Sequence, residues 1–208
     1  MSTVKVTALK HEDASVDNLT LNSDGTSTLA GNLVFSDASV QTTAPIGGIN
    51  FGTVVATTSG TSIDFTGVPA GVKKITVMFN EVSTNGTSII QIQIGTSGGI
   101  QTSGYQGVGF TTNTTMTAMS GGFLLSGVWA AAYSKSGIAT LSILDSSDGT
   151  WTFNSVTSLE TASTQVGVAQ DTGSGIKLLS GTLDRVRITT AGGANTFDAG
   201  SVNISWEF

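Results

Sequence analysis

Alternation of apolar and polar residues is the feature that most restricts the folds open to this chain of 208 residues. Isoleucine occupies every second position from 90 to 94, and glutamine fills the positions between. This period of two predicts a β-strand over residues 88–94 with one face on the core and one face in water. Residues 73–82 alternate in the same way, and the turn pair Asn85-Gly86 separates the two segments. The sequence therefore predicts a β-hairpin over residues 73–95.

Short alternating segments recur through the rest of the chain with turn residues between them. Further strands are predicted at residues 52–58, 62–65, 123–132, 137–144, 150–159, 165–170, 176–179, 183–189 and 201–206. Gly173-Ser174-Gly175 is expected to be a loop, and residues 95–109 a long Gly-rich loop or loosely held strands. About ten short strands with turns between them are typical of an antiparallel β-sandwich, here expected to resemble a jelly roll.

Composition supports an all-β fold and excludes several classes of function. Gly, Ser and Thr make up roughly 40% of the chain, and charged residues only 11%, so good helix formers are scarce. The 8 Lys and Arg and the net charge of −6 provide no basic surface for nucleic acid. No cysteine is present, which excludes disulfides and thiolate metal sites. No apolar run approaches the ~20 residues of a membrane span, so membrane insertion is not expected.

The N-terminal segment differs from the rest of the chain. Residues 1–48 contain only short apolar pieces, and elements of this size are marginal in water on their own. We therefore expect an extended β arm that is ordered against copies of itself or another protein, with a disordered tail as the alternative. Its trimerisation and attachment residues are predicted to be Leu19, Leu21, Leu33 and Phe35. Pro45 and the pair Gly47-Gly48 mark the boundary to a second domain, residues 49–208.

Groups suited to catalysis are few. The only histidine, His11, lies in the arm, so a Ser-His-acid triad is not expected. Asp145, Asp148 and Glu160 are the acids that a polysaccharide depolymerase would use, because glycoside hydrolysis needs two carboxylates. Asp145 and Asp148, however, lie in a predicted hairpin turn, where aspartate commonly serves as a turn former. We predict no catalytic residues, no metal site and no cofactor.

Aromatic residues near predicted turns are the candidates for ligand contact. Tyr105, Tyr133 and Trp151 could stack on sugar rings while their polar atoms form hydrogen bonds. The alternative is that the tryptophans, Trp129 and Trp151, fill the core of the sandwich, because aromatic rings contribute strongly to core packing. The Ser- and Thr-rich surface suits contact with sugar hydroxyls, and it equally suits a rigid β scaffold.

Parts of the sequence resemble fibre and virion structural proteins of tailed bacteriophages, notably of cyanophage and marine phage type. The resemblance lies in residues 4–11 (VKVTALKH), 18–25 (NLTLNSDG), 65–79 (FTGVPAGVKKITVMF), 83–88 (STNGTS) and 95–105 (GTSGGIQTSGY). It implies a virion component, usually a homotrimer, with an N-terminal anchor and a C-terminal β knob. It implies no catalytic residues.

These observations lead to one expectation with three alternatives. The chain is expected to be a non-enzymatic virion protein on the exterior of the phage particle, a short tail or head fibre. Its N-terminal arm would bind other virion proteins of the capsid or tail, and its knob would adsorb to a host surface glycan. A capsid decoration or cement protein is the alternative within this class. The alternatives of other classes are an envelope-polysaccharide depolymerase and a free carbohydrate-binding module.

Overall fold

The computed structural model describes residues 8–9, 19–23, 27–29, 33–34, 40–41, 48–112, 116–161 and 166–208. All regular elements in these ranges are β-strands, which confirms the predicted all-β class. The chain divides into two compact units, Met1–Gly47 and Gly48–Phe208. This division lies one residue from the boundary expected at Gly48.

The N-terminal unit contains very short strands. Strands β1 (Ala8–Leu9), β2 (Leu19–Leu21) and β3 (Ser27–Leu29) form a sheet in that order, and β4 (Leu33–Val34) pairs with β5 (Val40–Gln41). The pairing of β2 with β3 reverses the chain after Leu21. Ladders of two or three residues bury too little apolar surface to be stable alone.

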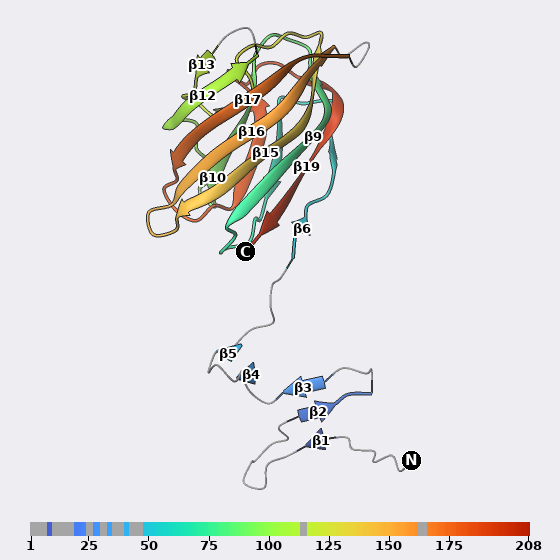
Figure 1. Cartoon of the computed structure of the whole chain (residues 1–208), viewed down its shortest axis with the longest axis vertical. Helices are drawn as coiled ribbons and strands as arrows, with labels where there is room; N and C mark the ends of the chain where they lie inside the picture. Colours follow the sequence, from blue (N-terminus) through green and yellow to red (C-terminus); the bar gives the residue numbers. More distant parts are fainter. Residues whose placement is uncertain are drawn as a thin grey trace. The chain divides into compact units, whose positions relative to one another are not determined.

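The second unit is an antiparallel β-sandwich, as predicted. Its large sheet has nine strands in the order β13-β12-β17-β16-β15-β9-β19-β6, with β7 also paired to β19. The strands are β6 (Asn50–Phe51), β7 (Val55–Ala56), β9 (Lys74–Thr84), β12 (Tyr105–Thr111), β13 (Met116–Ala118), β15 (Tyr133–Asp145), β16 (Thr150–Thr161), β17 (Val166–Leu178) and β19 (Phe197–Glu207). Six of them, from β12 to β19, cross the front of the sandwich in Figure 1.

The small sheet lies behind the large one in this view (Figure 1). It contains β8 (Ser62–Thr66), β10 (Ile90–Thr96), β11 (Gly99–Ile100), β14 (Phe123–Leu124) and β18 (Arg185–Thr190). Its order is β11-β10-β18-β8, and β14 pairs with β10. The pairs in both sheets are antiparallel.

The hydrophobic core lies between the two sheets. The large sheet contributes Ile75, Val77 and Leu141, and the small sheet contributes Ile92 and Ile188, all fully buried. Burying one such side chain stabilises the fold by about 1.5–3 kcal/mol. The inward residues of both sheets therefore account for the alternation seen in the sequence.

One predicted hairpin is confirmed and the other is wrong. Strands β15 and β16 pair along their length around the turn at residues 145–149, as expected. Strands β9 and β10, by contrast, lie in different sheets: β9 pairs with β15 and β19, and β10 pairs with β18. Asn85 bonds to Thr196 through both its backbone amide and its side chain, so the chain crosses between sheets instead of closing a turn. A local turn signal does not indicate which long-range partner a strand takes.

The prediction that one face of β10 is exposed to solvent is also wrong. Gln91 and Gln93 are 5% and 6% exposed. The Gln93 side chain donates a hydrogen bond of 2.7 Å to the carbonyl of Gly121, and Gln91 donates one to the carbonyl of Thr190. A Cβ at Gly122 would lie 2.7 Å from the Gln91 amide carbon, so only glycine permits this close covering. Gly121 and Gly122 thus lie against the glutamines, and the carbonyls of Gly121 and Thr190 accept hydrogen bonds from their side chains.

Gly173-Ser174-Gly175 lies inside β17 and is not the predicted loop. Its glycines stand opposite Gly109 and Gly107 of β12. A Cβ at Gly173 would lie 2.3 Å from the carbonyl oxygen of Leu124, which passes across this part of the strand. Glycine is required here because the backbone at Leu124 lies close to β17. The sequence pattern had instead suggested glycines of a loop.

Candidate functional site

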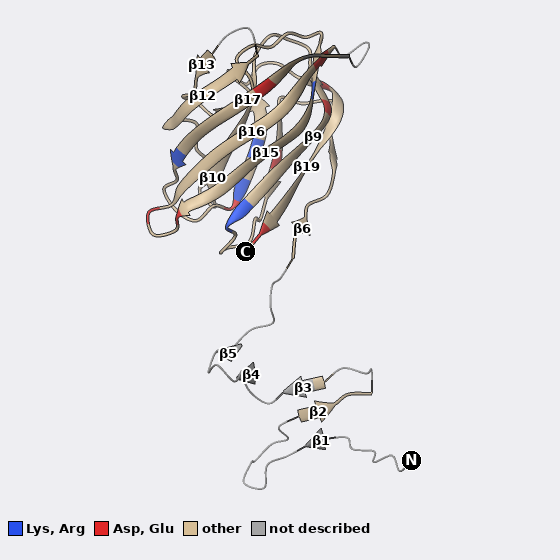
Figure 2. Ribbon diagram, viewed as in Figure 1, with Lys and Arg blue, Asp and Glu red and all other residues tan. Residues whose placement is uncertain are grey.

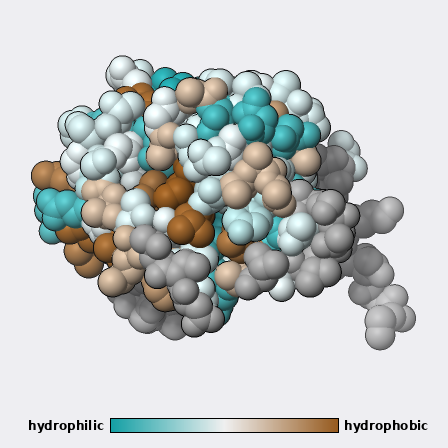
Figure 3. Space-filling model, turned by 90° about the horizontal axis from the view of Figure 1, so that it is seen from above, coloured by the Kyte–Doolittle hydropathy of each residue, from teal (hydrophilic) through white to brown (hydrophobic). Residues whose placement is uncertain are grey.

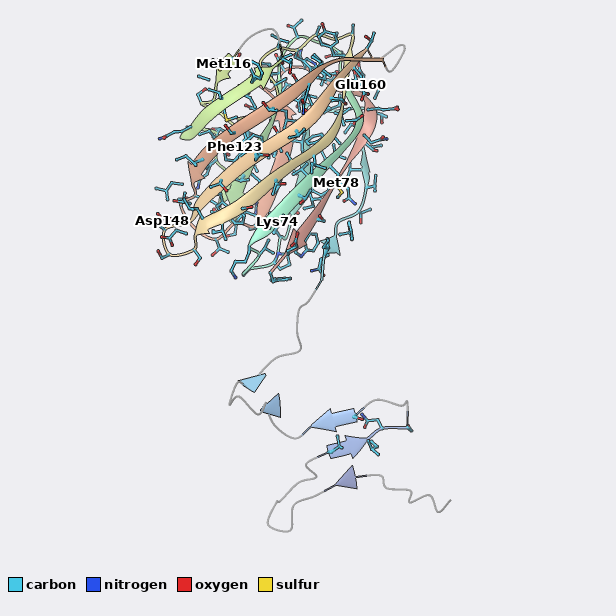
Figure 4. The ribbon with its side chains drawn as sticks, in the orientation of Figure 1. Lys74, Met78, Met116, Phe123, Asp148 and Glu160 are labelled. Carbon is cyan, nitrogen blue, oxygen red and sulfur yellow. The ribbon has the colours of Figure 1, made fainter. Side chains whose placement is uncertain are left out.

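A row of six side chains, five of them apolar, crosses the outer face of the large sheet. Cross-strand register aligns Met116, Phe110, Thr172, Val156, Ile138 and Met78 on β13, β12, β17, β16, β15 and β9. We call this set the apolar row. Met116, Ile138 and Val156 are 69%, 50% and 46% exposed, so these side chains face away from the core. Met116 and Met78 mark two positions along it in Figure 4.

The surroundings of the apolar row are polar but uncharged. The next row of the same face consists of Thr76, Thr140, Asn154 and Ser174, which stand opposite one another on successive strands. The middle stretches of β9, β15 and β16 carry no Lys, Arg, Asp or Glu (Figure 2). Lys74 and Glu207 form an ion pair of 2.9 Å at the ends of β9 and β19.

This face has the size and composition of a protein interface. Six adjacent strands spaced ~4.8 Å apart, with up to 13 residues each, span on the order of 1,000 Å². A stable interface buries about 800 Å² per partner, and its centre is depleted of charged residues. The sequence pattern did not reveal this surface, because its residues are far apart in the chain. The sequence did contain one signal of this surface. Ile, Val and Phe occupy outward positions in strands whose other outward residues are mostly Ser and Thr.

A pocket of about 540 Å³ opens at one end of the sandwich. The turn at residues 146–149 and the segments 69–73 and 178–183 line it, and we call it the end pocket. Val72, Trp151, Leu179 and Leu183 supply its apolar wall, while Lys73 and Asp148 supply charge. Apolar walls with a few polar groups are typical of small-molecule sites.

The turn beside the end pocket holds its acids through local hydrogen bonds. The Asp145 carboxylate accepts bonds from the backbone amide and the hydroxyl of Ser147, at 2.7 and 2.6 Å. These bonds lower the pKa of Asp145, the hydroxyl contributing most. Asp148 accepts a bond of 2.8 Å from the Thr150 amide. Both aspartates therefore act as turn formers, which was the simpler interpretation of the sequence.

Glu160 lies far from these aspartates. Asp148 precedes β16 and Glu160 ends it, so the two carboxylates are at opposite ends of the strand (Figure 4). A strand of 12 residues spans ~40 Å, whereas the carboxylates of a glycosidase lie roughly 5–10 Å apart. Glu160 accepts hydrogen bonds from Ser158 and Ser136 instead. The structure thus does not bring together the three acids that a depolymerase was expected to use.

Two of the three predicted ligand-contact aromatics are buried. Tyr105 is 3% exposed, and its hydroxyl accepts a bond from the Ile94 amide and donates one to the Gln101 carbonyl, each at 2.8 Å. Burial raises the pKa of Tyr105 to about 12. Trp151 is 2% exposed and contributes only to the wall of the end pocket. Both rings pack in the core, so neither presents a face for stacking on a sugar.

The other aromatics are placed as follows. Trp129 is buried, and its indole nitrogen donates a bond of 2.8 Å to the Thr84 hydroxyl. The core alternative is therefore correct for both Trp129 and Trp151. Tyr133 is half-buried, and its ring centroid lies 6.4 Å from that of Trp129 in an edge-to-face arrangement. Of the three predicted contact residues, Tyr133 alone retains substantial exposure.

The predicted arm residues are described only in part. Leu19 is half-buried and Leu21 is 45% exposed, both on β2. Leu33 begins β4, while Phe35 and His11 lie outside the described residues. The trimerisation role of these residues stays a prediction.

Comparisons with known proteins identify no relative. No model of a protein family matches the chain, and no curated protein or solved structure matches it. In the described parts of the chain, no helix has the length and apolar character needed to cross a membrane. The same ranges hold no group of three His, Asp or Glu side chains placed to bind a metal ion.

The surface at one end of the sandwich is mixed in character. Figure 3 shows small brown patches among mostly white and teal residues, which is the appearance expected of a chain rich in Ser, Thr and Gly. Large apolar side chains among the described residues are also exposed outside the apolar row, including Ile49, Phe51, Val54, Leu144 and Leu178.

Proposed function

We propose that this protein is a structural component of a virion, a short fibre that displays its β-sandwich as a knob. The observation that carries the proposal is the apolar row on the uncharged outer face of the large sheet. A surface of this kind is stabilised when another protein covers it, because exposed apolar area is then removed from water. The occupant we favour is another copy of the chain, in a homotrimer.

The N-terminal unit supports the attachment part of the proposal. Its strands have only two or three residues each, so they need a partner surface to become stable. Other virion proteins of the capsid or tail would supply that surface. The resemblance of residues 4–11 and 18–25 to the starts of phage fibre proteins is in accord with this role.

The end pocket supports the adsorption part of the proposal. The exposed Leu178 side chain of its lining can contact a sugar ring, and the Lys73 ammonium and the Ser146 and Ser147 hydroxyls can bind hydroxyl or carboxylate groups. A glycan of the host surface is the ligand class that this chemistry favours. Such binding would require no catalytic group.

Two measurements test the proposal. Light scattering of the full chain at micromolar concentration should give the mass of a trimer, and a stable monomer would overturn the assembly claim. Immunogold labelling of intact particles with antibodies to residues 48–208 should mark fibres on the exterior. Labelling spread evenly over the capsid would indicate the alternative, a decoration protein.

A further inference from the structure

Lys135 and Asp171 form an ion pair inside the sandwich. Both side chains have no exposed surface, and the Lys135 ammonium donates a hydrogen bond to Oδ2 of Asp171. Lys135 lies on β15 and Asp171 on β17, so the pair bridges across the strand between them, β16. Complete burial of two charges is unusual in a chain with only 22 acidic and basic residues, 14 Asp and Glu with 8 Lys and Arg.

The groups that hydrogen-bond to the pair are uncharged, and Glu160 is a further acid whose charge favours the protonated form of Lys135. The Thr111 hydroxyl donates a hydrogen bond to Oδ1 of Asp171 at 2.5 Å, and it accepts one of 3.1 Å from the Gly127 amide. The Thr157 hydroxyl accepts a bond of 3.2 Å from Lys135 Nζ. The Trp129 ring centroid lies 5.5 Å from the same nitrogen. The two carboxylate oxygens are thus distinguished, because one faces a hydroxyl donor and the other faces the amine.

Burial destabilises the charged form of Lys135. Desolvation lowers the pKa of Lys135, while Asp171 acts in the opposite direction. Removing two ions from water costs several kcal/mol each, and their mutual attraction recovers only part of that cost. Transfer of one proton from Nζ to Oδ2 gives a neutral amine in contact with a neutral carboxylic acid. These are the two reactants of amide formation, held together with water excluded.

We propose that Lys135 and Asp171 are the site of an intramolecular isopeptide bond. Nζ of Lys135 attacks Cγ of Asp171, the Nζ–Cγ bond forms, and the Cγ–Oδ2 bond breaks. Of the three ammonium protons, one stays on the amide nitrogen and two leave with Oδ2 as water. Charge and atoms balance, and no oxidant or other co-reactant is required.

The surrounding hydroxyls have defined parts in this step. Negative charge develops on Oδ1 during the attack, and the Thr111 hydroxyl that already bonds Oδ1 stabilises it. The Thr157 hydroxyl, which bonds Nζ, can carry a proton from the nitrogen to the departing Oδ2. The contact between Nζ and the carboxyl group places the reacting atoms together before reaction, which removes an entropic barrier.

The product would be a covalent bridge from β15 to β17. It would close a loop between residues 36 positions apart, and a cross-link of this kind stabilises a fold mainly because it lowers the entropy of the unfolded chain. It would do so without cysteine, which this chain lacks. The inference does not depend on the proposed fibre function.

Intact-mass spectrometry of the full chain tests this directly. The bond is expected to make the protein lighter than its sequence by one water, with Lys135 and Asp171 joined in one branched peptide after proteolysis. Asp148-Gly149 can also lose water by forming a succinimide, so the sample is first incubated at mildly alkaline pH, which hydrolyses succinimides to aspartyl or isoaspartyl residues of full mass and leaves isopeptides. A treated protein with the full mass of its sequence would overturn the proposal.

Matched lysine variants give a second readout. Lys135→Met removes the amine, and this variant should have the full mass of its own sequence. Lys177→Met is the control, because Lys177 is also buried and lies 5.5 Å from an aromatic centroid, that of Tyr105, but donates to the Leu178 carbonyl. It should keep the loss of one water. If both variants differed from the masses of their own sequences by the same amount, the assignment of the bond to Lys135 would be contradicted.

Discussion

Arg187 and Asp64 stand directly opposite each other on β18 and β8 and are joined by two hydrogen bonds of 2.6 and 2.7 Å. The fork of the guanidinium matches the carboxylate, and this bonding raises the pKa of Arg187. Its sheet neighbour Arg185 instead bonds Asp184, the adjacent residue in the chain.

Removing one partner of this pair should have a small and salt-dependent effect. Both side chains are about one-third exposed, so Asp64→Asn should lower the free energy of unfolding by no more than ~1 kcal/mol. The loss should be smaller at 1 M salt, because salt screens the attraction. Urea unfolding at two salt concentrations measures this, with Glu207→Gln as the control at the singly bonded Lys74 pair. A loss above 3 kcal/mol would mean that the pair has a different role.

Replacement within the apolar row should weaken self-association without unfolding the knob. The double variant Ile138→Thr, Val156→Thr removes apolar area from the centre of the face while keeping β-branched residues on the strands. We expect a dissociation constant at least about tenfold higher, measured by sedimentation, since each such change removes roughly 1 kcal/mol of burial. Leu144→Thr is the control, because Leu144 is 69% exposed and lies outside the row. Unchanged association would place the interface elsewhere.

Adding one methyl group at Gly173 should be costly. The new Cβ would lie 2.3 Å from the Leu124 carbonyl oxygen, so backbone must move. We expect Gly173→Ala to lower the free energy of unfolding by about 2–4 kcal/mol. Gly167→Ala in the same strand is the control, because nothing lies within 4 Å of its added Cβ, and its effect should stay below ~1 kcal/mol. Denaturant unfolding compares the two, and equal losses would contradict the close approach.

The hydroxyl of Ser147 should control the ionisation of Asp145. Because its bonds favour the charged carboxylate, the pKa of Asp145 should lie below 3.8 and rise toward that value in Ser147→Ala. A carboxylate whose pKa is lowered in the folded state stabilises the fold at pH values above its ordinary pKa. This stabilisation is lost as the pH falls through the lowered pKa. NMR titration of the side-chain carboxyl measures the shift. Ser146→Ala leaves both bonds in place and should change nothing.

Sequence reasoning identified the inward faces well, because burial imposes a regular period on a strand. Ile75, Val77 and Ile92 alternate as expected and are buried as expected. The β15–β16 hairpin was also predictable, since the Asp-rich turn and both strands are contiguous in the chain. These features depend on neighbours within a few residues.

Features that depend on distant partners were not predictable. Asn85 belongs to a crossing between sheets only because Thr196 binds it, and Gln93 is buried only because Gly121 lies over it. The apolar row likewise assembles from six strands and has no signature in any one of them. The Lys135–Asp171 pair was missed for the same reason, because its partners are adjacent only after β15, β16 and β17 have paired.

The lengths of the edge strands have a consequence for solubility. The long, Thr- and Val-rich strands of the large sheet lie in its interior, while β13 and β6 at its two ends have three and two residues. Long exposed edges recruit strands from other molecules and start amyloid-like aggregation, whereas short ones offer few unsatisfied amides. A protein with edges this short keeps most of its backbone amides closed to neighbouring molecules even at high concentration. It would still leave the broad face of the sheet open for ordered contact.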